Sequence, residues 1–148
     1  MSQNSLISQN KKARHDYEVL DSLEAGIALT GTEVKSCREH NVSLRESHAR
    51  ILDGELWLID AHIAPYKQGN ISNHEPRRKR KLLVHKSQLR RLAQATEAKG
   101  LTLVPLKMYF SRNRAKIELG LCRGKRKYDK RESMKRKMHK REAEQATR

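Results

Sequence analysis

Short hydrophobic runs with a period of two dominate the chain between residues 16 and 122. This alternation is typical of half-buried β-strands. A polar pair at 21–22 predicts a bend between the first two runs, whose hydrophobic residues are Tyr17, Val19, Ala25, Ile27 and Leu29. Later runs predict strands at 81–85, 101–110 and 115–121, and the polar link 111–114 predicts a hairpin between the last two.

The clearest hairpin signal joins His48–Leu52 to Glu55–Ile63 through Asp53 and Gly54. An Asp-Gly pair supplies the positive φ angles that a tight type I′ turn requires. The sequence therefore predicts two antiparallel neighbours here.

Two segments depart from the period of two and predict helices. Residues 32–39 contain no helix breaker, and Thr32 has the side chain of an N-cap. Residues 86–100 end at Gly100, a natural helix stop, and place one set of residues on a common face: Leu89, Leu92, Ala93 and Thr96.

Five to seven strands with two or three peripheral helices favour a mainly β fold, most simply an OB-like closed antiparallel barrel. Residues 65–80, with two prolines and Gly69, predict a long connecting loop. A chain of 148 residues is long enough for one such domain with one core.

The charge is concentrated at the C-terminus. Residues 123–148 carry twelve Lys or Arg against four Asp or Glu, which is half of the net charge of +16. Such a segment buries too little apolar surface to offset the entropy of ordering, so we predict a disordered basic C-terminal tail. Phosphates of a nucleic acid would supply the missing counter-charge. The other half of the net charge, +8, lies on the body before residue 123 and should attract the body to phosphate as well.

Membrane insertion and export are not expected. No apolar run approaches the roughly 20 residues that span a bilayer, and the polar start lacks the hydrophobic region of a signal peptide. Cys37 and Cys122 have no partner at CxxC or metal-ligand spacing, so we expect packing residues in a reduced, cytoplasmic setting.

Motifs for catalysis are absent from the sequence, including HExxH, G-x-S-x-G and the Walker A loop. The seven histidines are scattered, and those in strand patterns, His62 and His85, are expected to be packed or surface groups. We therefore predict no enzyme, no cofactor and no metal.

Two basic clusters in the body are candidates for nucleic-acid binding. One is 10–15, just before the first strand; the other is 77–81, five consecutive cations on the predicted loop, where a structural role is hard to imagine. Trp57 and Phe110 are assigned to the core, which leaves few rings for base stacking. This scarcity favours recognition of phosphate and RNA shape. In the tail, Tyr128 lies at the centre of the densest cation cluster and could stack on a base.

Five motifs together resemble the SmpB family, the SsrA-binding (tmRNA-binding) proteins of bacterial trans-translation. They run in family order over nearly the whole chain, at Asn10–Tyr17, Glu24–Ser36, Arg80–Leu83, Gly100–Leu106 and Gly124–Arg131. Tyr128 departs from the family pattern, in which His is common, and so lacks a titratable imidazole.

The resemblance implies an OB-fold body over 1–122 that binds the tRNA-like domain of tmRNA and brings it to ribosomes stalled without a stop codon. It implies that the tail, 123–148, is disordered when free and helical in the ribosomal mRNA channel, where it senses that no message is present. The implied partners are tmRNA, small-subunit rRNA at the decoding centre and mRNA channel, and, through the charged tmRNA, elongation factor Tu. Nothing demands more than a monomer.

The resemblance also assigns residues by position. Those facing the tRNA-like RNA are Asn10, Lys11, Arg14, Tyr17, Glu24, Thr32, Glu33 and Lys35. Those of the tail at the decoding centre are Gly124, Lys125, Arg126, Lys127, Tyr128, Asp129, Lys130 and Arg131. The two carboxylates are compatible with an RNA site, because a carboxylate can accept from 2′-hydroxyls or orient a neighbouring cation.

Two other classes remain open on physical grounds. A structural protein of the ribosome fits a small barrel with a basic extension equally well, but it would remain bound to subunits at fixed stoichiometry. A nuclease would need a metal-binding carboxylate set, for which Glu24 and Glu33 would be the candidates.

Overall fold

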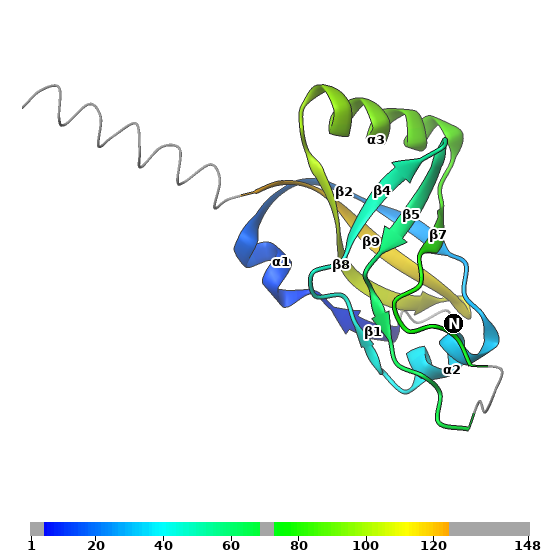
Figure 1. The fold of residues 1–148 in the computed structure, drawn as a ribbon. Helices are drawn as coiled ribbons and strands as arrows, with labels where there is room; N and C mark the ends of the chain where they lie inside the picture. Colours follow the sequence, from blue (N-terminus) through cyan, green and yellow to red (C-terminus); the bar gives the residue numbers. More distant parts are fainter. Residues whose placement is uncertain (1–4, 69–72, 125–148) are drawn as a thin grey trace, which may run out of the picture.

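The computed structural model describes residues 5–68 and 73–124, and within these ranges the fold is mainly β with three helices (Figure 1). The order along the chain is β1 (Ser5–Gln9), α1 (Lys11–Asp16), β2 (Tyr17–Ile27), α2 (Gly31–Arg38), β3 (Val42–Ser43), β4 (His48–Leu52), β5 (Glu55–Ile59), β6 (His62–Ile63), β7 (Arg80–Leu83), α3 (Lys86–Ala98), β8 (Thr102–Ser111) and β9 (Arg114–Gly124). The prediction of a mainly β fold with two or three helices is confirmed.

Seven strands form one antiparallel sheet in the order β1-β8-β4-β5-β7-β2-β9. A further pairing between β8 and β9 closes six of them into a ring, with β1 attached outside it to β8. β3 and β6 form a separate two-stranded ladder. α1 contacts β2 and β8, whereas α3 lies across the other end of the ring (Figure 1).

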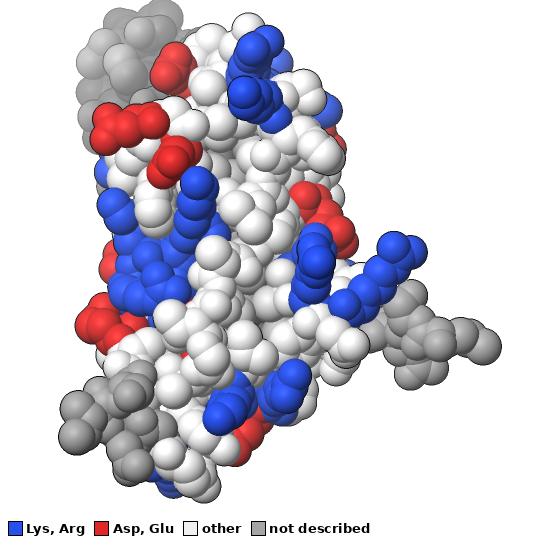
Figure 2. Space-filling view, turned by 90° about the vertical axis from the view of Figure 1, so that its right-hand side faces the viewer, with Lys and Arg blue, Asp and Glu red and all other residues white. Residues whose placement is uncertain are grey.

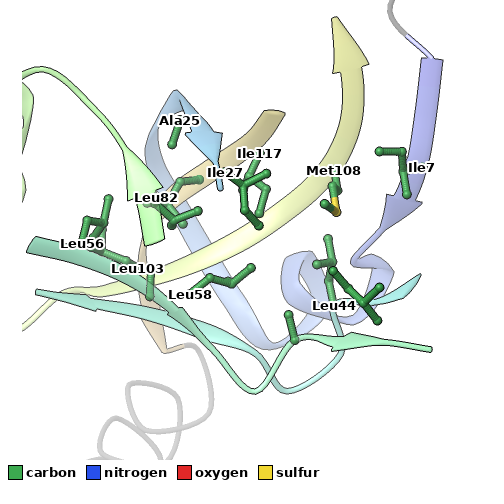
Figure 3. Close-up of a cluster of buried hydrophobic side chains, with 14 of the residues drawn as sticks. Ile7, Ala25, Ile27, Leu44, Leu56, Leu58, Leu82, Leu103, Met108 and Ile117 are labelled. Carbon is green, nitrogen blue, oxygen red and sulfur yellow. The ribbon is translucent and has the colours of Figure 1, made fainter. Parts of the chain in front are cut away.

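The core lies inside the ring and is built by strand alternation. Leu56 and Leu58 of β5, Leu82 of β7 and Ile117 of β9 point inward and are almost fully buried (Figure 3). Alternate residues of the same strands face outward, as the pleat requires. A second, smaller cluster holds α1 against β8 and β9 through Ala13, Val104, Leu106 and Cys122.

Both predicted hairpins are present. Asp53 and Gly54 have φ angles of 51° and 75°, and His48–Leu52 pairs with Glu55–Ile59. The second strand of this hairpin is shorter than predicted, because Asp60 adopts a φ of 64° and the chain leaves the sheet there. The link 111–114 joins β8 and β9 as expected.

β2 is one strand of eleven residues, and the predicted bend at 21–22 is instead an irregularity of its ladder with β9. The register shifts between Val19 and Asp21, so the extra residue is accommodated as a bulge without ending the strand. The hydrophobic pattern loses phase at that point for this reason.

Helix boundaries differ from the prediction at one end. α2 is capped by Thr30, not Thr32: the Thr30 side chain accepts the N3 backbone N–H, and Glu33 accepts the Thr30 N–H at 2.8 Å. α3 ends as predicted, since Gly100 has a φ of 63° directly after the C-cap Lys99. β1 and α1 were not predicted, because their sequences are polar and short.

Core assignments are confirmed for the thiols and wrong for the tryptophan. Cys37 and Cys122 are free and fully buried, and burial raises the pKa of Cys37 to about 12 and that of Cys122 to about 11. Trp57 lies on the outer side of β5, since its neighbours Leu56 and Leu58 occupy the inward positions. Phe110 is half-buried and packs against the core.

Candidate nucleic-acid interface

The N-terminal basic cluster is presented by α1. Lys11 and Arg14 are exposed and three residues apart, so they lie on the same side of the helix, while Ala13 packs beneath. Tyr17 follows the helix directly, is half-buried and packs against the Ala13 cluster. The helix therefore presents two exposed cations to solvent, and the hydrophobic cluster around Ala13 holds it against the body.

Asn10 anchors the start of α1 and is itself buried. Its amide Nδ2 donates to the carbonyl oxygens of Leu44 at 3.2 Å and Pro105 at 3.0 Å, and its backbone N–H donates to Leu106 O at 2.8 Å. The Nδ2 group and the backbone N–H of Asn10 therefore join the start of α1 to the segment of Leu44 and to β8. Asn10 positions the helix and has little surface for a ligand.

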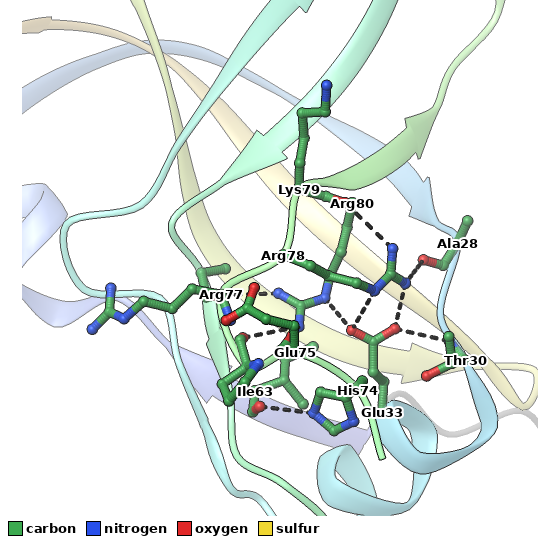
Figure 4. Close-up of polar contacts among 12 residues, drawn as sticks. Ala28, Thr30, Glu33, Ile63, His74, Glu75, Arg77, Arg78, Lys79 and Arg80 are labelled. Atoms are coloured by element: carbon green, nitrogen blue, oxygen red, sulfur yellow. Dashed lines mark hydrogen bonds and ion pairs between the residues drawn. The ribbon is translucent and has the colours of Figure 1, made fainter. Parts of the chain in front are cut away.

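Glu33 is the centre of a buried ionic cluster at the N-terminus of α2. Its carboxylate is fully buried and accepts hydrogen bonds from Arg78 and Arg80, in addition to the Thr30 N–H (Figure 4). Burial raises the pKa of the carboxyl, but the bonds from Arg78, Thr30 and Arg80 outweigh burial, so the pKa lies below its ordinary value. The carboxylate stays ionised.

Arg80 connects this carboxylate to two further segments. It is fully buried and donates to the carbonyl oxygens of Ala61 at 2.8 Å and Pro76 at 3.0 Å. Arg78 is partly exposed and also reaches Ala28 O at 3.5 Å. The Glu33 cluster, defined as Glu33, Arg78 and Arg80, therefore holds α2, the chain after β2 and the segment before β7 together.

The expectation that 77–81 has no structural role is wrong. The strand β7 begins at Arg80, after a turn at 76–77, and alternate side chains of a strand face opposite ways. Arg78 and Arg80 point to Glu33, whereas Lys79 points away (Figure 4). Lys79 Nζ lies 4.5 Å from the centroid of the Trp57 ring. The five cations are thus divided between an interior cluster and the surface.

Thr32 and Lys35 lie on α2 beside the Glu33 cluster. The Thr32 hydroxyl bonds His74 Nδ1 at 2.9 Å, and His74 Nε2 lies 2.8 Å from Ile63 O. Because a carbonyl oxygen can only accept, Nε2 carries the proton in this arrangement and a neutral His74 accepts from Thr32 at Nδ1. Lys35 is exposed, with Nζ 5.4 Å from the Tyr66 ring centroid.

Glu24 lies apart from the α2 group, on β2. It is exposed and accepts a hydrogen bond from the Tyr109 hydroxyl of β8. Burial and this bond raise the pKa of Tyr109, so the hydroxyl remains a donor. Lys107 lies beside it, 3.4 Å from Glu118 and 5.7 Å from the Tyr109 ring.

The predicted site residues thus form three groups. One is α1 with its flanks (Asn10, Lys11, Arg14, Tyr17), one is α2 (Thr32, Glu33, Lys35), and the third is Glu24 with Tyr109. Gly124 pairs with Tyr17 at the end of the β2–β9 ladder, which brings the first residues of the predicted tail beside α1. Lys125, Arg126, Lys127, Tyr128, Asp129, Lys130 and Arg131 lie outside the described residues.

Sequence reasoning did not predict that Arg78 and Arg80 bind Glu33, or that Lys79 lies over the Trp57 ring. The available signal was the position of the five cations at the start of a strand, where alternation separates odd from even residues. Over residues 5–68 and 73–124, no group of three or more His, Cys, Asp or Glu side chains could hold a metal ion. None of the helices in these ranges is long and apolar enough to cross a membrane.

Comparison with known proteins gives consistent matches. Residues 7–148 match the family model described as SmpB protein. An SsrA-binding protein of Carboxydothermus hydrogenoformans is 60% identical over 143 residues, covering 97% of this chain and 96% of the relative. One of Streptococcus pneumoniae is 55% identical over 132 residues, covering 89% and 85%. A solved structure described as "tmRNA-SmpB: a journey to the center of the bacterial ribosome" contains a chain that is 60% identical, with a TM-score of 0.68, covering 80% of this chain and 83% of that one.

Proposed function

The chain belongs to the SmpB family, and on that premise we propose that it is an RNA-binding adaptor of trans-translation. It binds the tRNA-like domain of tmRNA and delivers it to ribosomes stalled without a stop codon. The observation that supports this function most strongly is the 60% identity to an SsrA-binding protein over nearly the full length of both chains.

The closed ring of six strands supports the finer description of the body as an OB-like barrel. In an OB-fold, one strand face and the loops beside it bind the nucleic acid, while the interior of a small barrel is filled by side chains. The hydrophobic interior of the ring in this chain agrees with a small filled barrel.

Direct RNA contacts are assigned to the exposed members of the predicted set. Lys11, Arg14 and Lys35 pair with phosphates, and Glu24, with its Tyr109 partner, accepts from 2′-hydroxyls or base amines. Tyr17 and Thr32 contribute the edges of these surfaces. Two members act indirectly: Asn10 sets the position of α1, and Glu33, which is fully buried, holds the segment around α2.

The segment from Gly124 to Arg131 is assigned to the ribosome, at the decoding centre, with the rest of the tail in the mRNA channel. Its support is the charge of residues 123–148, twelve Lys or Arg against four Asp or Glu, and the match of the family model through residue 148. The protein acts in the cytoplasm, where the ribosomes are, and performs no chemistry itself, since peptide transfer belongs to the ribosome. Elongation factor Tu is a companion only through the charged tmRNA.

The test is a gel-shift titration of the full chain against the tRNA-like domain of tmRNA, with ordinary tRNA as competitor at physiological salt. Tight binding that tRNA does not displace is expected. Equal, steeply salt-dependent binding to both RNAs would contradict the adaptor function and favour a structural ribosomal protein. Lys11→Gln is expected to weaken binding and to reduce the salt slope by about 0.9 per lost phosphate contact.

A further inference from the structure

We propose that Asn73 is a positioning residue for RNA binding at α2: its side-chain amide ties the chain back to Tyr66 and thereby holds the Tyr66 ring beside Lys35. The inference rests on the proposed function in one respect, since it takes Lys35 as a phosphate contact. Neither Asn73 nor Tyr66 is a member of the predicted site set.

The side-chain amide of Asn73 bonds both backbone groups of Tyr66. Its Oδ1 accepts the Tyr66 N–H at 3.1 Å, and its Nδ2 donates to the Tyr66 carbonyl oxygen at 2.5 Å. The same Oδ1 accepts the N–H of His74 at 3.2 Å. A side-chain amide carries both an acceptor and donors, so it can replace a backbone peptide group in such a two-way pair. Asn73 therefore does for Tyr66 what a neighbouring strand would do.

This pair continues one that the backbone begins. The Ile63 N–H donates to the carbonyl oxygen of Pro76 at 3.0 Å. Position 66 lies as far beyond 63 as position 73 lies before 76, so the two contacts share one antiparallel register. The carbonyl oxygen of Pro76 also accepts from the buried Arg80 at 3.0 Å. The order that the Glu33 cluster imposes on this segment thus extends to Tyr66 through Asn73.

The same segment is fastened to one side of α2. Thr32 and Ser36 are four residues apart and lie on a common side of the helix. Ser36 Oγ donates to the carbonyl oxygen of Ala64 at 2.6 Å, and the Thr32 hydroxyl bonds His74 Nδ1 at 2.9 Å. Lys35 is the neighbour of Ser36 and is exposed. Its side chain therefore leaves α2 at the place where the segment is fastened.

The Tyr66 ring limits the positions that the Lys35 ammonium group can take. The distance from Nζ to the ring centroid is 5.4 Å, within the range of a cation–π contact. A cation that is already ordered loses less entropy on binding a phosphate than a free lysine does. The side of the molecule that carries α2 also has several groups of Lys and Arg side chains with fewer acidic ones between them, which suits an anionic partner (Figure 2).

The experiment measures binding of the full chain to the tRNA-like domain of tmRNA at several salt concentrations. Asn73→Ala removes no charge, yet we expect it to weaken binding about two- to fivefold, as for the loss of an exposed cation–π restraint. It should also lower the salt slope by up to about 0.9, the value for one phosphate contact. A purely structural role of Asn73 would leave the salt slope unchanged, and that result would overturn the proposal. In combination with Lys35→Gln, Asn73→Ala should have little further effect.

Two further variants separate the amide of Asn73 from the ring that it positions. Tyr66→Leu keeps the backbone groups that Asn73 binds and removes the ring, so it should match Asn73→Ala in affinity and salt slope. The matched control is Asn41→Ala. Asn41 has an exposed side chain, and it holds this segment through its backbone oxygen, which accepts the Ala64 N–H at 2.9 Å and is kept in the variant. Equal weakening by Asn73→Ala and Asn41→Ala, or fully additive losses with Lys35→Gln, would overturn the proposal.

The position of Lys35 in the free protein is measured by the NMR shifts of its ε-methylene protons, which the ring current of Tyr66 displaces. We expect this displacement in the natural chain and its loss in both Asn73→Ala and Tyr66→Leu. A displacement that survives Asn73→Ala would overturn the positioning role without reference to RNA. If the natural chain does not bind the tRNA-like domain, the proposed function fails, whereas the NMR result still decides whether Asn73 positions Lys35.

Discussion

The buried Glu33 cluster gives the sharpest prediction of stability. Glu33→Gln keeps the size of the side chain but removes the charge that compensates Arg80, which is fully buried. Removing one partner of a buried ion pair costs about 3–5 kcal/mol. Arg80 keeps its carbonyl acceptors on Ala61 and Pro76, and Gln still offers one oxygen, so we expect the lower end of this range.

Urea unfolding followed by the emission of Trp57 measures this change. With a slope of about 1.5 kcal/mol per molar urea, a loss of about 3 kcal/mol moves the midpoint down by about 2 M. A loss below about 1 kcal/mol would refute the assignment of Glu33 as the compensating charge.

A double-mutant cycle tests the same assignment without relying on one substitution. The single variants of the cycle are Glu33→Leu, which leaves Arg80 buried without its carboxylate, and Arg80→Met, which leaves Glu33 buried beside Arg78 alone; each should destabilise the fold. In the double variant Glu33→Leu with Arg80→Met, neither fully buried charge of the pair remains, and Arg78, which is partly exposed, can turn to solvent. Replacing both members of a buried pair by hydrophobic residues is often nearly neutral, so the double variant should be more stable than the sum of the single losses predicts. Strict additivity would contradict the coupling.

Three further outcomes are expected. The pKa of Glu33 is lowered in the folded protein. The ionised carboxylate therefore stabilises the fold fully above its ordinary pKa of 4.5, and this stabilisation is lost as the pH falls through the pKa of the folded state. An acid titration of the unfolding free energy should show this loss in the natural protein and not in Glu33→Gln. The thiols of Cys37 and Cys122 should resist alkylation at pH 8 in the folded chain, since both are buried and have pKa values of about 12 and 11, and should react on unfolding; rapid labelling of the native chain would contradict the packing. Gly54→Ala should lower the unfolding free energy by about 1 kcal/mol, because position 54 has a φ of 75°, which strains any residue with a Cβ. The new methyl group itself would meet no atom within 4 Å, so the backbone angle is the only cost. An unchanged urea midpoint would contradict this strain.

Local chemistry made part of the fold predictable. The Asp53-Gly54 pair and the Gly100 stop specify backbone angles directly, so the first hairpin turn and the end of α3 agree with the sequence prediction. The cap of α2 was misassigned because Thr30 and Thr32 are chemically alike, and only the position of Glu33 at N3 distinguishes them.

Features that depend on distant residues could not be predicted. β1 has a polar sequence and forms a strand because it pairs with β8. Trp57 faces outward because Leu56 and Leu58, its two chain neighbours, take the inward positions of β5. For the candidate site, the resemblance supplied positions but not roles. Asn10 and Glu33 have polar side chains that suggest contact with RNA, but the fold commits both to interior hydrogen bonds.

The end of the β2–β9 ladder has a mechanical consequence. Tyr17, which directly follows α1, is paired with Gly124, and from there β9 leads into the predicted tail. α1 and the chain after Gly124 therefore leave the ladder at the same end. A force that pulled the tail away from α1 would load these strand pairs one at a time, starting at Tyr17 and Gly124, and would open them like a zipper. The direction of the pull, and not only its strength, would then decide whether the β2–β9 ladder stays paired under tension on the tail.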